Sequence, residues 1–259
     1  MPKIIAELGP GDSLGIGLAA LISGCEKYYA FDIIKHTNAK RNIHIFDELV
    51  SLFARRENIP GKDEFPNIKP DIEDHRFPEE LLAGNNLSVS MRDNRIKKIR
   101  DSIFSNGHPD SMIHYKAPWT SSDLIEKETI DMIYSQAVLE HIDDLSGAYK
   151  SMRMWLKPNG YISHMVDFKC HGTAEDWNGH WAYSDFTWKI IRGRRPYHIN
   201  REPLSIHIEM LEEQSFKIVC QQAFKLPSRL KREDMGQKFR KYTDDDISTS
   251  GLFIQAVKI

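Results

Sequence analysis

Cysteine is scarce in this sequence. The three cysteines, Cys25, Cys170 and Cys220, lie in separate segments of a 259-residue chain. An odd number of cysteines at such spacing argues against a disulfide scaffold and against a cysteine-based zinc site, and it favours a reducing compartment. We therefore expect a cytoplasmic protein.

Long apolar runs are also missing. No segment approaches the roughly 20 consecutive apolar residues that a membrane-spanning helix requires. The first residues, MPKIIAELG, show no long apolar stretch with a small-residue cleavage site. The sequence predicts a soluble protein without a membrane partner.

Neither sign of charge is in excess. The chain has 35 basic and 37 acidic residues and a formal net charge of -2. This balance gives no electrostatic basis for a nucleic-acid or anionic-membrane partner. The hydrophobic content of 41% is ordinary for a globular protein, and the length suits one large α/β domain or two small ones.

Short apolar runs alternate with helical patterns along the chain. Strands are predicted at residues 3–8, 27–33, 112–116, 130–135, 161–168, 216–223 and 251–259, and helices at 14–23, 143–156 and 203–214. Such alternation predicts a mostly parallel sheet with helices on both faces. The last two strands lack a convincing intervening helix, which favours an antiparallel pair at the sheet edge. Residues 157–160, KPNG, predict a turn.

Two stretches exceed what this sheet needs. Residues 37–110 predict an insertion with helices around 43–56 and 92–104, and residues 169–203 predict a lid or substrate loop rich in histidine, tryptophan and arginine. The basic residues 229–240 predict an exposed helix. We expect a single domain over residues 1–259 that carries both additions.

A glycine-rich turn follows the first predicted strand. Gly9 and Gly11 flank Pro10 there, and glycine tolerates positive φ and lets the backbone approach a ligand. The helix that follows offers free N–H groups. Asp32 ends the second predicted strand, 21 residues after Gly11, where a carboxylate can accept both hydrogen bonds of a ribose diol. This pairing fits any adenosine-type cofactor.

Two cofactor classes compete for this turn. A dinucleotide site calls for G-x-G-x-x-G, but that register puts Leu14 at the third glycine and Gly15 one place late. Glu7 discriminates better. An acid two residues before the first glycine would repel a pyrophosphate, whereas it suits a cationic ligand such as an ammonium or a sulfonium.

The residues 7–13, ELGPGDS, resemble motif I of class I S-adenosylmethionine-dependent methyltransferases (type 11-like), usually written (D/E)-x-G-x-G-x-G. Asp32 matches the ribose-binding acid of that family. Residues 130–141, IDMIYSQAVLEH, resemble the motif of its fourth strand, and residues 156–161, LKPNGY, resemble the loop before its fifth. No single motif is specific, but four in this order are.

The resemblance implies a Rossmann-like α/β fold with a seven-stranded sheet, mostly parallel with an antiparallel C-terminal strand. It also implies S-adenosyl-L-methionine as the cofactor. The cofactor-binding residues that it implies are Glu7, Gly9, Pro10, Gly11, Ser13, Asp32, Ile33, Pro118, Trp119, Ser135 and Gln136.

The sequence departs from the family pattern in three places. Ser13 replaces the last motif glycine, so the loop can sit slightly differently. The chain starts almost on the first strand, without the preceding helix that usually helps to cover the cofactor. No acid follows the third strand to bind the adenine amine; Pro118 and Trp119 stand there, and Trp119 is as well suited to the core as to packing on adenine.

Methyl transfer depends mainly on positioning. Holding two substrates in line supplies up to about 7–11 kcal/mol, whereas a general base adds roughly 3–5 kcal/mol. Histidine suits the base, since its ordinary pKa lies near neutrality. Candidates follow the fourth and fifth strands, and we select His141, His164 and His171 from a group that also includes Asp167 and His180.

A metal ion is not expected. His164, Asp167, Cys170, His171 and His180 are suitable ligand types, but their spacing matches no standard site. The aromatic and polar residues 177–185 can line a pocket for a carbohydrate-like acceptor or pack as a lid. Residues 192–195, RGRR, can bind an anionic group of the acceptor or form a solvated surface run.

We expect a methyltransferase that modifies a small-molecule acceptor at oxygen or nitrogen. The alternatives are an NAD(P)-dependent oxidoreductase and a non-catalytic partner subunit that binds S-adenosylmethionine. Nucleic-acid methylation is disfavoured by the charge balance, and by residues 135–138, SQAV, where such enzymes carry Asn/Asp-Pro-Pro-aromatic.

Overall fold

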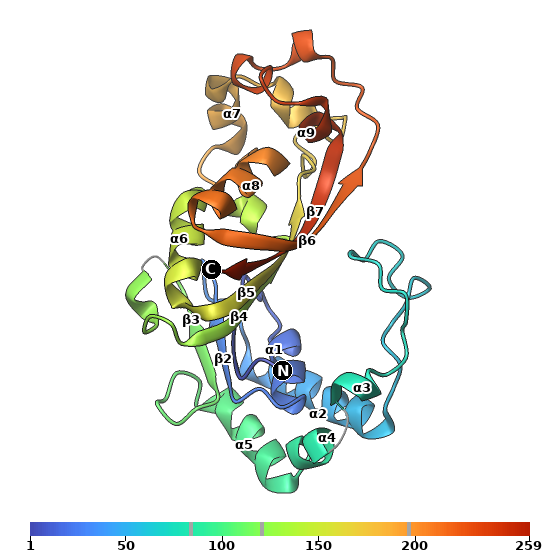
Figure 1. Ribbon diagram of the computed structural model, residues 1–259, viewed down its shortest axis with the longest axis vertical. Coiled ribbons are helices and arrows are strands. Elements are labelled where there is room, and N and C mark those ends of the chain that lie inside the picture. Colours follow the sequence, from blue (N-terminus) through green and yellow to red (C-terminus); the bar gives the residue numbers. More distant parts are fainter. Residues whose placement is uncertain (83–84, 120–121, 196–197) are drawn as a thin grey trace. The chain divides into compact units, whose positions relative to one another are not determined.

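The computed structural model describes residues 1–82, 85–119, 122–195 and 198–259 (Figure 1). Within them the strands form one seven-stranded sheet in the order β3-β2-β1-β4-β5-β7-β6. The strands are β1 (Ile4–Leu8), β2 (Lys27–Phe31), β3 (Ile113–Lys116), β4 (Ile130–Gln136), β5 (Leu156–Asp167), β6 (Phe216–Lys225) and β7 (Thr249–Lys258). β1, β2 and β3 are parallel, while β7 is antiparallel to β5 and β6. The predicted Rossmann-like sheet with its antiparallel ending is confirmed.

The helices largely match the predicted ones. They are α1 (Gly15–Ile22), α2 (Ala39–Arg55), α3 (Glu79–Leu82), α4 (Asn85–Ser90), α5 (Asp93–Phe104), α6 (Leu145–Trp155), α7 (Asp185–Arg192), α8 (Leu204–Glu213) and α9 (Asp244–Ser248). The segment between β2 and β3 carries α2 to α5, so the predicted insertion is helical. None of the helices in the described residues is long and apolar enough to cross a bilayer.

The chain forms two compact units. The first contains Met1–Tyr134 and Met154–Gly160, and the second contains Ser135–Arg153 and Tyr161–Ile259. The expectation of a single domain with two additions stays a prediction.

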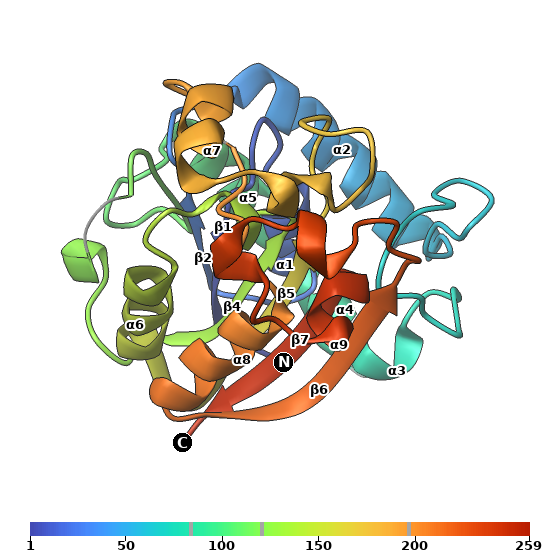
Figure 2. The same ribbon diagram turned by 90° about the horizontal axis from the view of Figure 1, so that it is seen from above.

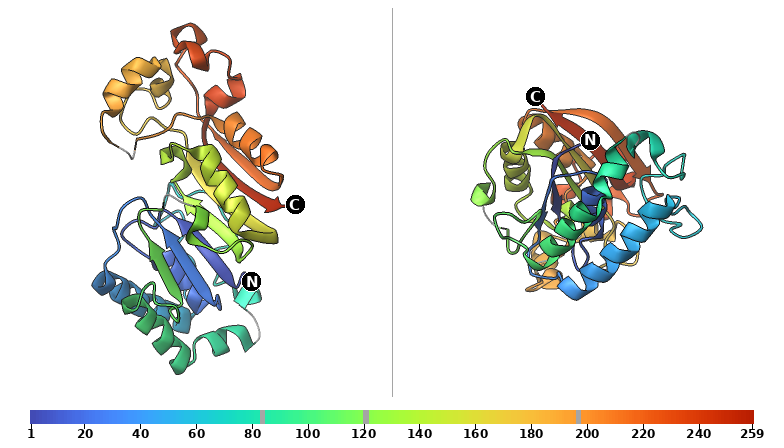
Figure 3. Two further views of the ribbon diagram at one scale, coloured as in Figure 1. Left: turned by 90° about the vertical axis from the view of Figure 1, so that its left-hand side faces the viewer. Right: turned by 90° about the horizontal axis from the view of Figure 1, so that it is seen from below.

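In the first unit, α1, α2 and α5 cover one face of β1, β2 and β3 (Figure 3). Alternate strand residues such as Ile5, Tyr28 and Ile113 point to this face, because successive side chains of a strand alternate between its faces. They pack with Leu18 of α1 and Phe46 of α2. The strand ends that carry the predicted cofactor residues are thus fixed by a continuous apolar core.

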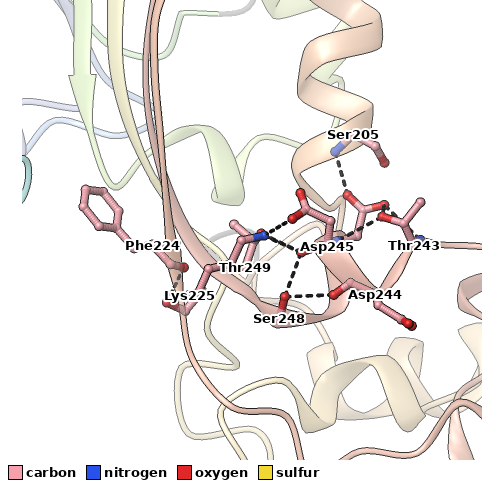
Figure 4. A network of polar contacts seen from close by, with 10 residues as sticks. Ser205, Phe224, Lys225, Thr243, Asp244, Asp245, Ser248 and Thr249 are labelled. Carbon is pink, nitrogen blue, oxygen red and sulfur yellow. Dashed lines mark hydrogen bonds and ion pairs between the residues drawn. The ribbon is translucent and has the colours of Figure 1, made fainter.

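In the second unit, β6 and β7 run side by side as long antiparallel strands beside α8 (Figure 2). The β6–β7 connection ends in α9, where Thr243 and Asp246 form a reciprocal capping box. The other carboxylate oxygen of Asp246 accepts a hydrogen bond from the Ser205 amide of α8 at 2.9 Å (Figure 4). Asp246 thereby ties the start of α9 to the start of α8.

Two predictions of local structure are wrong. Residues 157–160 do not form a turn outside the sheet: β5 already begins at Leu156, and Asn159 adopts a φ of 63° inside the strand. Residues 229–240 form no continuous helix, only the short turns Arg232–Asp234 and Gln237–Phe239. Met235 and Phe239 of this segment are buried, so core packing overrides the helical charge pattern.

Candidate functional site

The turn after β1 has the backbone that its glycines predict. Gly9 and Gly11 adopt φ angles of 66° and 65°, in the left-handed region that favours glycine. The Gly9 amide donates to the carbonyl of Phe31 at 2.7 Å, which ties the turn to the end of β2. A Cβ built on Gly11 would meet no protein atom within 4 Å, so the backbone at Gly11 borders open space.

Asp32 lies immediately after β2 and points at this turn. Its Oδ2 accepts a hydrogen bond from the Gly11 amide at 3.0 Å, and its Oδ1 accepts one from the Ile33 amide at 2.8 Å. The side chain is buried, with 6% exposed. A carboxylate has about four acceptor positions, so these two bonds leave room for a ribose diol.

The segment after β3 meets the same strand end. The Trp119 amide donates to the carbonyl of Asp32 at 3.0 Å, and the Trp119 ring lies 6.2 Å from Phe31 and 6.0 Å from Trp155 between centroids. Trp119 is partly buried and Pro118 is exposed. The backbone of Trp119 is therefore at the predicted cofactor site, and its ring contacts the core.

Glu7 faces the core under α1. Its Oε2 accepts hydrogen bonds from the hydroxyls of Tyr28 and, at 3.1 Å, of Tyr134. Gly17 of α1 leaves space for the Tyr28 ring, since a Cβ there would come within 2.2 Å of it. Burial raises the pKa of Glu7 to about 7, although both tyrosines oppose the shift. The predicted cationic partner of Glu7 would favour its ionised form.

The remaining turn residues have simple roles. The Ser13 hydroxyl accepts a hydrogen bond from the Gly15 amide at 3.1 Å, so the residue that replaces the last motif glycine caps the turn instead. Pro10 is partly buried, and the side chain of Ile33 is 47% exposed beside Asp32. An exposed apolar side chain next to the expected ribose site is available to a ligand.

The sequence analysis missed Asn42. This residue of α2 is fully buried; its Oδ1 accepts from the Leu14 amide at 2.9 Å and its Nδ2 donates to the Thr37 hydroxyl at 2.7 Å. It thereby satisfies one of the free amides at the start of α1. No local signal marks it, because it lies 28 residues from Leu14 inside the insertion.

In the second unit, Ser135 and His164 form a buried pair. The Ser135 hydroxyl and the His164 Nδ1 lie 2.8 Å apart, and His164 has no exposed surface. Burial lowers the pKa of His164 to about 3, so its imidazole is neutral and weakly basic near neutral pH. Gln136, the next predicted cofactor residue, is exposed.

His141 and His171, the other two predicted catalytic residues, lie together. Their rings are 5.1 Å apart between centroids and nearly perpendicular. Glu140 completes the group: one potential ligand atom from each of the three residues lies within 4.8 Å of the others. Asp167 approaches from β5, with 3.7 Å between its Oδ2 and the His171 Nε2.

The metal ligands that the sequence suggested as an alternative do not assemble. Of these five residues, only His171 belongs to a group of potential ligands among the residues that the structure describes. Cys170 donates its thiol to the Ala174 carbonyl at 3.4 Å, and His180 is buried, which lowers its pKa to about 3. Glu140, which the sequence analysis covered only as part of the fourth-strand motif, joins His141 and His171 instead.

The predicted lid shares a small hydrophobic core with the segment 230–247. Trp181 is buried and donates its indole N–H to the carbonyl of Arg201 at 3.0 Å. Arg201 lies 4.8 Å from the rings of Trp188 and Phe239 and pairs with Asp185 at 2.6 Å. Residues 177–185 therefore pack on this arginine and on the segment 227–247, where Trp181 joins the buried Met235 and Phe239. Residues 196–197 of the predicted lid lie outside the described part of the chain.

A cavity of about 580 Å³ lies elsewhere in the first unit. Helices α2, α3 and α4 and the residues next to them line it, with side chains that include Phe53, Phe77 and Met91. None of its lining residues belongs to the predicted site. It is a feature of the helical insertion.

Comparison with known proteins places the chain in a family. The family described as a methyltransferase domain matches residues 6–223, which include the turn after β1, Asp32 and the Glu140 group. The resemblance to class I S-adenosylmethionine-dependent methyltransferases is thereby confirmed, and S-adenosylmethionine is the cofactor of that class. No curated protein matches the chain significantly.

Solved structures of methyltransferases resemble the fold more distantly. An S-adenosylmethionine-dependent methyltransferase from Mesorhizobium loti aligns over 100% of this chain and 94% of its own at 13% identity, with a TM-score of 0.48. One from Methanosarcina mazei aligns over 99% and 92% at 13% identity, with a TM-score of 0.45. Phosphoethanolamine N-methyltransferase 2 from Haemonchus contortus aligns over 99% of this chain and 48% of its own at 13% identity, with a TM-score of 0.47. At these scores the alignments carry no argument about the acceptor.

Proposed function

The chain belongs to the methyltransferase domain family, and on that premise we propose that it transfers the methyl group of S-adenosylmethionine to a small-molecule acceptor, at oxygen or nitrogen. The observation that carries the proposal is the bond between Asp32 and Gly11. It brings a carboxylate from the end of β2 to an open glycine turn at the end of β1. This is the arrangement that an adenosine cofactor with a free ribose diol requires.

The methyl donor fits this site better than a dinucleotide does. Glu7 stands directly before the turn and is 5% exposed, and its environment already raises its pKa to about 7. A pyrophosphate nearby would disfavour its ionised form further, whereas the ammonium or sulfonium of S-adenosylmethionine would favour it. The oxidoreductase alternative is therefore not favoured.

We propose that the acceptor binds next to the rings of His141 and His171. Both rings are about one-third exposed or less, at 27% and 32%, so they are reachable yet held in place. His164 is a poor base, because burial lowers its pKa to about 3. It forms a hydrogen bond with Ser135 instead. A base contributes 10²–10⁴-fold where the acceptor is a hydroxyl, and is dispensable for an amine.

The acceptor is proposed to be small and to carry an anionic or polyhydroxyl group. The near-zero net charge of the chain supports a small molecule over a nucleic acid. Burial lowers the pKa of His198, and the charges of Arg195 and Arg192 lower it further, so both cations lie near that ring. Arg192 pairs with Asp143 at 2.6 Å and is held ready for a carboxylate or phosphate. A cytoplasmic location is proposed as well, supported by the free thiols of Cys25, Cys170 and Cys220.

The test is methyl transfer from S-adenosylmethionine with a labelled methyl group. The chain is incubated with the small-molecule fraction of a cell extract and, in parallel, with its protein and nucleic-acid fractions. Label in the small-molecule fraction that falls with Asp32→Ala at a donor concentration below saturation supports the proposal. Label in a macromolecular fraction contradicts the proposed acceptor class, and donor binding without transfer to any fraction favours a non-catalytic partner subunit.

A further inference from the structure

The Glu140 group consists of Glu140, His141 and His171. Glu140 and His141 follow β4, and His171 follows β5. One potential ligand atom of each lies within 4.8 Å of the others, and the His141 Nε2 is 4.0 Å from the Glu140 Oε1. Two imidazoles and one carboxylate thus converge on a common point from two loops.

The carboxylate of Glu140 is the unusual member. Its side chain is 3% exposed, and neither oxygen has a well-formed hydrogen bond to a described residue, although the backbone amides of Glu140 and Asp167 lie close enough to lower its pKa. Burying a carboxylate without a cationic partner costs several kcal/mol, so such groups in proteins are paired, protonated or bound to a cation. Lys169, whose charge acts on Glu140, already pairs with Asp167 at 3.0 Å.

The surrounding structure fixes the backbone of the two segments that carry these residues. Asn200 donates its amide N–H to the carbonyl of Glu140 at 2.6 Å, and its Nδ2 donates to the carbonyls of Leu139 and Ile142 at 2.8 and 2.9 Å. His171 adopts a left-handed φ of 49°, in a loop closed by a hydrogen bond from the Cys170 amide to the Trp177 carbonyl at 2.7 Å. A site held by such contacts is preorganised for a ligand.

We infer that Glu140, His141 and His171 bind a divalent metal ion. Two histidines and one carboxylate are the ligand set of catalytic zinc and of non-haem iron(II) sites, and imidazole selects such metals over magnesium and calcium. Three protein ligands leave positions for water or an acceptor oxygen. Asp167, at 3.7 Å from His171, supplies the carboxylate that often orients a metal-bound imidazole.

The consequence for the reaction rests on the proposed function. A metal ion at the Glu140 group would bind an oxygen of the acceptor and lower the pKa of its hydroxyl, as it does for water. An acceptor hydroxyl bound there would therefore lose its proton to solvent more readily, which favours an acceptor with an exposed hydroxyl and an O-methyl product.

The test is a calorimetric titration of the chelator-treated full chain with Zn²⁺, and separately with Mg²⁺, before any acceptor is known. The chain is compared with Glu140→Gln and with His171→Asn, since asparagine tolerates the left-handed backbone at that position. The control is His44→Asn, which removes an exposed histidine that pairs with Glu48 at 3.3 Å.

We expect one Zn²⁺ per chain and much weaker binding of Mg²⁺. Glu140→Gln and His171→Asn should each weaken Zn²⁺ binding by about 100-fold or more, since loss of an outer partner alone costs 10–100-fold. His44→Asn should bind Zn²⁺ as the parent does. Absence of a stoichiometric site, or unchanged affinity in either variant, overturns the inference.

Two further measurements keep the result interpretable. S-adenosylmethionine binding to the same samples, without metal, tests the proposed function separately. Failure of the metal site can thereby be distinguished from failure of the methyl-donor site. If circular dichroism shows that Glu140→Gln does not fold, the Zn²⁺ affinity of His171→Asn decides the test. The side chain of His171 is 32% exposed, so its replacement should leave the core intact.

Discussion

The Oδ2 of Asp32 accepts a hydrogen bond from the backbone amide of Gly11 at 3.0 Å, across the ends of two parallel strands. This contact joins the two parts of the sequence that the motif comparison singled out, 21 residues apart. The other carboxylate oxygen of Asp32, Oδ1, accepts a hydrogen bond from the Ile33 amide at 2.8 Å. The carboxylate is therefore fixed before a cofactor arrives, which reduces the ordering cost of binding.

Replacing Asp32 by alanine should weaken binding of S-adenosylmethionine. The expected loss is at least about 1.5 kcal/mol, the low end for hydrogen bonds to a charged group, or roughly tenfold in Kd. Isothermal titration calorimetry measures it. Asp110→Ala, which removes an acid that is 94% exposed, is the control and should leave the affinity unchanged. An unchanged affinity in Asp32→Ala would show that this residue does not hold the ribose.

Gly11 and Gly107 form a matched pair for a second test. Both have a positive φ, 65° and 84°, and a Cβ on either would meet no atom within 4 Å. Alanine at either position should cost about 1 kcal/mol in unfolding free energy, from left-handed backbone strain alone. Only Gly11→Ala should also impair cofactor binding, because its Cβ would enter the space that the ligand needs. Equal cofactor affinity in the two variants contradicts a ligand at this turn.

The raised pKa of Glu7 should make the free energy of unfolding depend on pH. Its pKa rises from 4.5 to about 7 on folding, so the folded state keeps a proton that the unfolded state loses between these values. This contribution to stability is present below pH 4.5 and is lost as the pH rises to 7. Glu7→Gln should therefore gain stability relative to the parent by about 2–3 kcal/mol between pH 5 and pH 8. Urea unfolding at both pH values measures the difference; a constant difference would mean that the carboxylate is not buried as described.

Asn200 should act as a positioning residue for the Glu140 group. Asn200→Ala removes the donor to the carbonyls of Leu139 and Ile142 and loosens the turn that carries Glu140. Zn²⁺ affinity should fall by about 10–100-fold, the usual effect of an outer partner. The affinity for S-adenosylmethionine in the same sample should stay unchanged. A parallel loss of both affinities would indicate a general folding defect instead.

The capping of α9 offers a stability test independent of function. Asp246→Ala removes the capping box with Thr243 and the acceptor for the Ser205 amide, and it should cost about 2 kcal/mol in unfolding free energy. Asp244→Ala in the same helix removes only an exposed ion pair to Arg232, which is worth about 0–1 kcal/mol. Thermal or urea unfolding compares the two. Equal losses would contradict the role of Asp246 between α8 and α9.

Sequence patterns predicted what depends on local chemistry. The strands, the glycine turn and the position of Asp32 follow from short periodic runs and from glycine conformation, and the structure has all three. The roles of Asn42 and Glu140 could not be read in this way, because each depends on a partner distant in sequence.

The same limit explains the errors. The helix predicted at residues 229–240 fails because Gly236 lies against the Tyr183 carbonyl, where a Cβ would come within 2.8 Å, and because Phe239 turns into the core. The charge pattern of residues 229–240 predicts neither of these two contacts. His164 looked like a base by type and position, but its burial, which lowers its pKa to about 3, depends on the packed strands around it.

The most direct test of the central claim is calorimetric titration of the full chain with S-adenosylmethionine and, separately, with NAD. We predict that the chain binds one S-adenosylmethionine and also binds S-adenosylhomocysteine, and that it does not bind NAD. Asp32→Ala should weaken the binding of S-adenosylmethionine. Binding of NAD alone, or no binding of the methyl donor at saturating concentration, would contradict the account.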